Sequence, residues 1–107
     1  MVMIRAIIRP ERTTAVLSEL LSAGFPAVTK VDVFGRGKQK GITIGEMHYD
    51  ELPKQMLMAV VADEDKDDVI SVILRTAKTG EGHVGDGRIF VTPVEEAYTV
   101  STGKPGL

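Results

Sequence analysis

The chain has 107 residues and a formal net charge of −2 at pH 7, with 43% hydrophobic and 26% charged residues. This composition is typical of a soluble globular domain, and the absence of a dominant basic charge argues against general nucleic-acid binding. The sequence has no cysteine, which excludes disulfides, thiolate catalysis and cysteine-ligated zinc. Arg5 and Arg9 interrupt the apolar N-terminal stretch too early for a signal peptide or a membrane span. We therefore expect a cytoplasmic protein with a single domain over residues 1–107.

The first part of the chain predicts a strand, a helix and a second strand. Residues 2–8 are apolar and β-rich, and Pro10 ends the run. From Thr13 the apolar spacing becomes helical, and Gly24 is placed to cap the helix end. The apolar residues at this spacing are Val16, Leu17, Leu20 and Leu21. Residues 28–34 form a second β run, whose two faces carry Val31 and Val33 on one side and Lys30 and Asp32 on the other.

The second part predicts one more helix between further strands. After a polar stretch, residues 55–62 read as a largely buried strand. Acidic residues crowd positions 63–68, and basic residues follow near the predicted helix end, as the helix dipole favours. The expected buried side of this helix consists of Val69, Ile70, Val72, Ile73 and Ala77. Residues 88–94 predict a fourth strand, and residues 97–100 predict a short fifth strand at an edge.

The resulting order, β-α-β-β-α-β, predicts an α+β fold of the ferredoxin-like sandwich type. In this fold two helices cover one face of an antiparallel sheet. The other face also carries apolar residues, so we expect other subunits to cover it.

Two glycine-rich, charged segments, residues 35–41 and 80–88, follow or precede predicted strands. Glycine lets the backbone approach a ligand, and the interleaved arginine and lysine supply charge for an anion, so the pair predicts a site for a phosphorylated small molecule. Neither segment has the Walker A ending or opens a helix like a Rossmann fingerprint. For one such segment alone, a hairpin with solvated lysines is the simpler interpretation. His48 and His83 have no metal-ligand spacing, and no nucleophile–base pair indicates an enzyme.

Several ordered motifs resemble the P-II signal-transduction protein family over essentially the whole chain. They occupy residues 3–10, 35–41, 52–54, 75–80, 85–91 and 102–103. The resemblance implies a compact trimer that holds ATP or ADP in each cleft between neighbouring subunits. It also implies a projecting T-loop at about residues 37–53 that contacts partner proteins, a B-loop at about residues 80–87 that wraps phosphates, and a C-terminal segment, residues 95–107.

The resemblance also implies roles for individual residues in a regulator that is not an enzyme. The nucleotide phosphates would contact Gly85, Asp86, Gly87 and Arg88 of the B-loop and Gly35, Gly37 and Lys38 at the T-loop base. The adenine pocket would be lined by Thr29 and Val60. 2-Oxoglutarate would bind beside ATP through Mg²⁺ ligated by Gln39, with Lys54 paired to a carboxylate and the backbone N–H groups of Lys40 and Gly41 holding the other oxygens.

The sequence departs from the common family pattern at four places. The T-loop is several residues shorter, and Tyr49 does not align with the tyrosine that is uridylylated in common bacterial members. The B-loop carries an apparent insertion within residues 81–84. The two C-terminal phosphate-binding arginines align with Thr99 and Ser101, so charge-assisted contacts would be lost. Lys104 lies near enough in sequence to replace one of them.

Further motifs indicate one branch of the family. Residues 24–27, 35–41, 49–54 and 94–99 resemble P-II-like proteins encoded with nitrogenase in methanogens and some anaerobic bacteria, specifically the first member of the usual pair. This branch implies direct control of nitrogenase by a homotrimer or by a hetero-oligomer with a second P-II-like chain. The alternatives are a P-II protein that regulates an ammonium transporter, a ferredoxin-like trimer without nucleotide sensing, and a small transferase.

Overall fold

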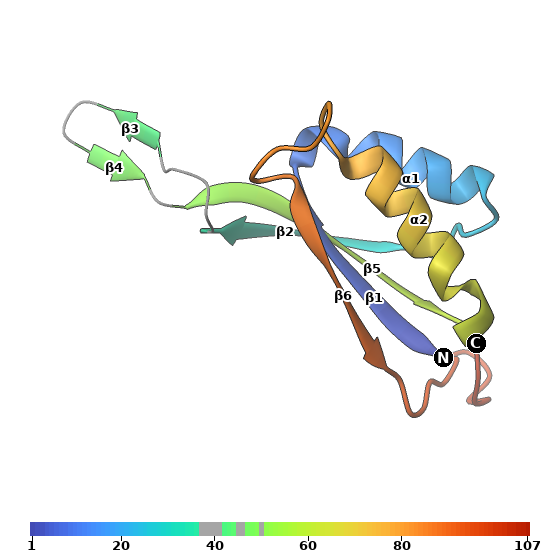
Figure 1. Cartoon of the computed structure of the whole chain (residues 1–107). Helices are drawn as coiled ribbons and strands as arrows, with labels where there is room; N and C mark the ends of the chain where they lie inside the picture. Colours follow the sequence, from blue (N-terminus) through green and yellow to red (C-terminus); the bar gives the residue numbers. More distant parts are fainter. Residues whose placement is uncertain (37–41, 45–46, 50) are drawn as a thin grey trace.

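The computed structural model describes residues 1–36, 42–44, 47–49 and 51–107. Its main body is a four-stranded antiparallel sheet with two helices on one face (Figure 1). The strands are β1 (Val2–Ile8), β2 (Thr29–Gly35), β5 (Leu52–Val61) and β6 (Gly87–Pro93), and the helices are α1 (Thr13–Ser22) and α2 (Lys66–Ala77). The strand order is β2-β5-β1-β6. The predicted ferredoxin-like β-α-β-β-α-β arrangement is therefore confirmed.

A second, two-stranded sheet interrupts this order between β2 and β5. It consists of β3 (Ile42–Ile44) and β4 (Met47–Tyr49), which pair antiparallel and extend away from the main sheet in Figure 1. No local pattern in the sequence predicted this hairpin. It stands within the predicted T-loop, and β5 begins at Leu52, three positions before the predicted start of that strand at Gln55. Lys54 consequently belongs to a strand.

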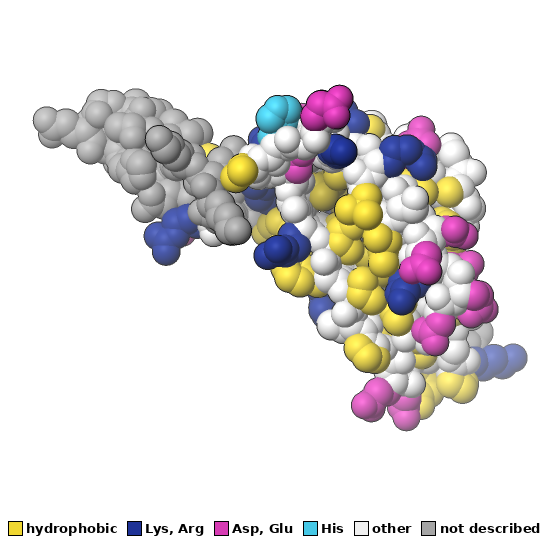
Figure 2. Space-filling view, viewed as in Figure 1, with side chains coloured by type: hydrophobic (Ala, Val, Ile, Leu, Met, Phe, Trp, Pro, Cys, Tyr) yellow, Lys and Arg dark blue, Asp and Glu magenta, His cyan; other side chains and the backbone are white. Residues whose placement is uncertain are grey.

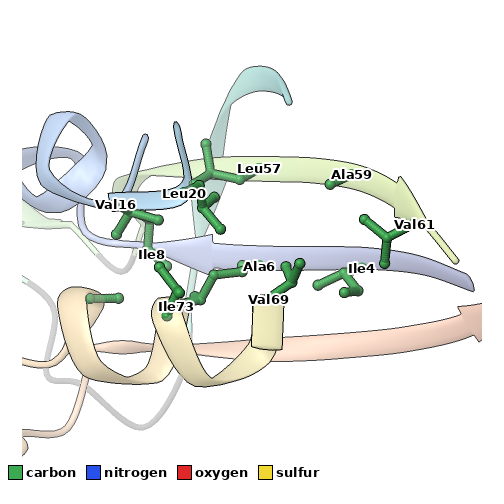
Figure 3. Close-up of a cluster of buried hydrophobic side chains, with 12 residues drawn as sticks. Ile4, Ala6, Ile8, Val16, Leu20, Leu57, Ala59, Val61, Val69 and Ile73 are labelled. Atoms are coloured by element: carbon green, nitrogen blue, oxygen red, sulfur yellow. The ribbon is translucent and has the colours of Figure 1, made fainter. Parts of the chain in front are cut away.

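The core lies between the helices and one face of the sheet (Figure 3). Alternation along β1 turns Ile4, Ala6 and Ile8 toward the helices, where each is at most 1% exposed. Leu57, Ala59 and Val61 come from β5, and the helices contribute Val16, Leu20, Val69, Val72, Ile73 and Ala77. The helical spacing thus predicted most buried positions, but Leu21 is 62% exposed. Its place one residue after the core residue Leu20 rotates it toward the solvent side of α1.

The ends of both helices have identifiable hydrogen bonds. The N–H of Gly24 donates to the carbonyl of Leu21, and that of Phe25 donates to Leu20, which closes α1 as a Schellman motif around the predicted glycine cap. Residues 63–65 form a separate 3-10 turn before α2. The guanidinium of Arg12 donates two hydrogen bonds, of 2.9 and 2.6 Å, to the carbonyl of Thr76. It thereby pairs one of the carbonyls that lack a partner at the C-terminal end of α2.

The predicted fifth strand is wrong. In place of a strand over residues 97–100, the chain forms a local hairpin with a single bridge between Tyr98 and Pro105. The N–H of Thr99 donates to the carbonyl of Lys104 at 2.9 Å, and that of Gly103 donates back to Thr99 at 2.7 Å. These hydrogen bonds join residues of the same segment, and the segment does not extend the sheet.

Among the described residues no helix has the length and hydropathy needed to cross a membrane.

Candidate functional site

The sheet face opposite the helices, here called the outer face, is apolar over much of its area. The strand register places Met3, Ile7, Val31, Met56, Met58, Val60 and Phe90 on it. Val31 and Phe90 are 41% and 47% exposed in the single chain. The register also confirms that Val31 and Val33 share a face opposite to Lys30 and Asp32.

One end of the outer face carries a row of charged side chains. Ile8 pairs with Gln55 on one side and with Gly87 on the other, so the next residue, Arg9, lies between Lys54 and Asp86. The Nε of Arg9 donates to Asp86 Oδ1 at 3.0 Å, and the same guanidinium donates to the carbonyl of Val84 at 2.9 Å. Three strands therefore bring these three charged groups together although they are far apart in sequence.

Lys54 links the two predicted ligand loops. It lies near the start of β5, directly after the T-loop segment, and its Nζ donates to the carbonyl of Gly85 at 2.7 Å. Burial, followed by the neighbouring positive charge of Arg9, lowers the pKa of Lys54. Glu11 and Asp86 oppose this shift, and a ligand carboxylate placed beside the ammonium would add to their effect and favour its charged form.

Residues 78–86 connect α2 to β6 and are here called the B-loop connection. The carboxylate of Asp86 organises it by accepting hydrogen bonds from the N–H and hydroxyl of Thr79, the N–H of His83 and the guanidinium of Arg9. Burial alone would raise the pKa of the Asp86 carboxyl, but these hydrogen bonds outweigh it and hold that pKa far below its usual range. The carboxylate is therefore charged, inward-facing and structural.

Glycine is required where the connection enters β6. Gly87 has a φ of +121°, and a Cβ built on it would stand 1.9 Å from the carbonyl oxygen of Ile7. Gly85 also has a positive φ, of +98°. Within the described residues, the N–H groups of Val84 and Gly85 donate to no acceptor. The backbone therefore comes close to β1 and keeps unpaired donors beside Lys54, as an anion site needs.

The predicted nucleotide residues spread along the outer face. Gly35 ends β2 opposite Leu52, near Lys54, whereas Thr29 begins β2 opposite Met58. Gly35 is six positions after Thr29 along the strand, which corresponds to about 20 Å. Arg88 is exposed at the start of β6 opposite Ile7. Gly35, Gly85, Gly87, Arg88 and Lys54 thus lie at the charged end, and Thr29 and Val60 lie toward the other.

Several predicted residues lie outside the described residues: Gly37, Lys38, Gln39, Lys40 and Gly41. The proposed magnesium ligand is among them. Within the described part of the chain, no group of three or more histidine, aspartate or glutamate side chains is arranged to hold a metal ion.

Sequence reasoning missed Arg9, Thr79 and His83 as residues that shape the site. Arg9 and Asp86 are 77 positions apart, and only the sheet register brings them together. His83 lies within the apparent B-loop insertion. Its Nδ1 contacts the carbonyl and the hydroxyl oxygen of Thr79 at 2.8 and 2.9 Å.

A depression of about 420 Å³ lies on the other side of the B-loop connection, between α2 and β6. Figure 2 shows hydrophobic side chains gathered there, with lysine and arginine side chains at its margin. Its lining includes Ile73, Leu74, Ala77 and Ile89, with Lys78 and Arg88. The connection therefore forms a wall shared by this apolar depression and the charged end of the outer face.

Comparison with known proteins identifies the family. The family model described as "Nitrogen regulatory protein P-II" matches residues 1–104 of this chain. The chain belongs to this family. It is 61% identical to the nifHD1 region GlnB-like protein 1 of Methanosarcina barkeri and 56% identical to the nifHD region GlnB-like protein 1 of Methanothermobacter marburgensis, with both chains of each pair covered completely. These relatives belong to the nitrogenase-associated branch that the sequence motifs predicted.

The fold comparison agrees. A crystal structure of Arabidopsis thaliana PII bound to citrate superimposes with a TM-score of 0.80 and 35% sequence identity, covering 98% of this chain and 84% of the other. The chain is thus a member of a nitrogen regulatory family with the ferredoxin-like fold of that family.

Proposed function

We propose that this protein senses ATP or ADP together with 2-oxoglutarate and controls nitrogenase by direct protein–protein contact, without being an enzyme. The observation that carries the proposal is the position of Lys54. This lysine follows the T-loop in the sequence and donates to Gly85 in the B-loop connection. A ligand that engages Lys54 therefore acts on both predicted ligand loops at once.

The nucleotide would lie along the outer face. Its phosphates would meet the glycine-rich backbone at Gly85 and Gly87, with Arg88, Gly35, Gly37 and Lys38 nearby, and its adenine would lie toward Thr29 and Val60. A dianionic keto acid beside the phosphates needs cations around it, which Lys54 supplies and which Mg²⁺ ligated by Gln39 would supplement. The citrate in the Arabidopsis relative supports a carboxylate ligand in this family.

The proposed assembly is a homotrimer, or a hetero-oligomer with a second P-II-like chain. The apolar outer face supports it, since such a face is unfavourable in water and suits burial between subunits. Each ligand cleft would then be completed by the C-terminal segment of a neighbour. Lys104 stands opposite Thr99 in the hairpin and is exposed, so it would supply the charge that Thr99 and Ser101 do not.

Regulation would follow from differential binding. If ATP with 2-oxoglutarate and ADP favour different T-loop arrangements, a partner that prefers one arrangement becomes coupled to metabolite levels, and the coupling is reciprocal. The names of the relatives, which place them in nitrogen-fixation gene regions, support nitrogenase as that partner.

The first test is calorimetric titration of ATP with Mg²⁺, with and without 2-oxoglutarate, on protein whose mass is measured by light scattering. We expect trimer-sized protein that binds the keto acid only when ATP is present. The Lys54→Met variant should still bind ATP, more weakly because Lys54 also holds the Gly85 carbonyl, and at saturating ATP its 2-oxoglutarate affinity should fall by about 10-fold or more. Lys66→Met, on α2 at a 42% exposed side chain, is the matched control.

A second test concerns Lys104 and the partner. Lys104→Ala should weaken ATP binding by about 10-fold, as expected for one charge-assisted contact, and unchanged affinity would show that this residue is not part of the site.

In pull-down from extract, retention of a nitrogenase component that 2-oxoglutarate with ATP reverses would support the proposed partner. Retention of an ammonium transporter instead would contradict it.

A further inference from the structure

The carboxylate of Asp86 has no capacity left for a ligand contact. Two carboxylate oxygens offer about four acceptor positions, and the four hydrogen bonds from Thr79, His83 and Arg9 occupy that number. Its side chain is only 17% exposed. A negative group in this position would also repel a phosphate, so its contribution to anion binding must pass through the loop that it orders.

The contacts of His83 extend the same network. A carbonyl oxygen only accepts, so the short contact between Nδ1 of His83 and the Thr79 carbonyl places the proton on Nδ1. The Thr79 hydroxyl then accepts from this N–H and donates its own proton to Asp86 Oδ1. A continuous chain of hydrogen bonds therefore runs from His83 through Thr79 and Asp86 to Arg9.

We propose that Arg9, Thr79 and His83 are positioning residues for the anion-binding loop, and that Asp86 is their common acceptor and not a ligand of the phosphates. The identity of the anion as a nucleotide rests on the function proposed above. The physical advantage is preorganisation. A glycine-rich loop loses much conformational entropy when it is ordered, and ordering it before the ligand arrives removes that cost from binding.

Arg9 and Lys54 fix the loop from two sides. Arg9 holds Asp86 and the carbonyl of Val84, while Lys54 holds the carbonyl of Gly85. Because these carbonyls are turned toward the two cations, the neighbouring unpaired N–H groups remain available to an anion. The loop would thus be ordered by side chains that never touch the nucleotide.

The test is Thr79→Val, which keeps the shape of the side chain and removes the hydroxyl. We expect the dissociation constant for ATP with Mg²⁺ to rise about 10-fold, equivalent to about 1.4 kcal/mol. Thr79→Ser, which keeps the hydroxyl, should restore affinity to within about 2-fold. Hydrogen exchange of the backbone amides of residues 80–86, measured on ligand-free protein, should be faster in Thr79→Val. Thr14→Val on the exposed side of α1 is the control.

The two readouts separate the outcomes. A purely structural threonine would lower the free energy of unfolding but leave ATP affinity unchanged at a temperature where both proteins are folded, and that result overturns the proposal. If the wild type binds no ATP, the proposed function fails, while the exchange rates still decide whether Thr79 orders the loop. If Thr79→Val does not fold, Arg9→Lys replaces it. The lysine ammonium lacks the fixed fork by which Nε of Arg9 bonds Asp86 and its second nitrogen bonds the Val84 carbonyl. The ATP affinity of Arg9→Lys should therefore fall while the exchange of its loop amides rises.

Discussion

The B-loop connection and the C-terminal segment are both predicted to contact phosphates, yet they are held in different ways. The connection is tied to the sheet by Arg9 and Lys54, which reach it from 77 and 31 positions away in sequence. In the described part of the chain, the hydrogen bonds of residues 95–107 instead join residues of that same segment, such as Thr99 with Lys104. Every residue from 98 to 107 is exposed.

This difference indicates what each region would need from a neighbouring subunit in the proposed assembly. The connection is ordered by its own subunit and can present its backbone donors without help. The C-terminal hairpin has a defined local shape but little contact with its own subunit, and Val100 at its turn is 99% exposed. A hairpin of this kind suits contact with a neighbouring subunit, so the two regions would meet as halves of one cleft.

The largest expected effect comes from Gly87→Ala. A Cβ at this position would overlap the Ile7 carbonyl at 1.9 Å, and the positive φ adds strain. We expect a loss of about 3 kcal/mol or more in the free energy of unfolding, because β6 must move away from β1 to relieve the overlap. Urea unfolding at one fixed protein concentration measures this loss, and the fixed concentration removes the effect of subunit association.

The matched control is Gly103→Ala in the C-terminal hairpin. Gly103 also has a positive φ, of +69°, but a Cβ placed on it would have no neighbouring atom within 4 Å. The expected cost is therefore the conformational strain alone, about 1 kcal/mol. Equal losses for the two variants would contradict the view that only the connection is packed against the sheet.

The next effect concerns acid stability. The pKa of Asp86 is lower in the folded state than its unfolded value of about 3.9. Its stabilising contribution is therefore complete above that unfolded pKa and is lost as pH falls through the folded pKa. Asp86→Asn should lose about 2 kcal/mol at neutral pH, as expected when hydrogen bonds to a charged group are weakened. Its unfolding free energy should also depend less on pH below about 4.

Denaturant midpoints measured between pH 2.5 and 7 check this prediction. Asp67→Asn is the control, because that carboxylate is 93% exposed and lies 4.0 Å from its lysine partner. Exposed pairs of this type contribute little to stability. Identical acid profiles for wild type and Asp86→Asn would show that the Asp86 network does not contribute to folding.

The parts of the fold that were predicted depend on local periodicity. A continuous apolar, β-rich run predicted β1 at Val2–Ile8, and helical spacing together with Gly24 predicted α1 and its C-terminal cap. Arg9 could not be assigned in this way, since its partners depend on which strands become neighbours. The fifth strand failed because Tyr98 and Val100 alternate like strand residues while their backbone groups find partners within a short hairpin. Register and partner choice are set by tertiary contacts.

The candidate site likewise has parts that the local sequence predicted and parts that depend on tertiary contacts. Glycine-rich composition identified both loops, because glycine at Gly85 and Gly87 is a local requirement of the backbone. The inward orientation of Asp86 was not predictable, since an aspartate between two glycines reads equally as a ligand or as a loop anchor. Only the long-range donor Arg9 and the local donors Thr79 and His83 decide between these roles.

The smallest expected effect is Thr102→Ala in the C-terminal hairpin. The hydroxyl of Thr102 accepts from the N–H of Lys104 at 3.2 Å, a long contact between exposed residues. Removing it should change the free energy of unfolding by about 0.5 kcal/mol or less, because water replaces the lost acceptor. Thr79→Ala should cost several times more, since it leaves part of the Asp86 carboxylate without a donor. Urea unfolding of both variants makes the comparison.

A loss of unfolding free energy above about 1.5 kcal/mol in Thr102→Ala would exceed the contribution of a typical neutral hydrogen bond. It would mean that the hairpin is held by more than its own contacts. The two regions that are predicted to contact phosphates would then no longer differ in the way described above.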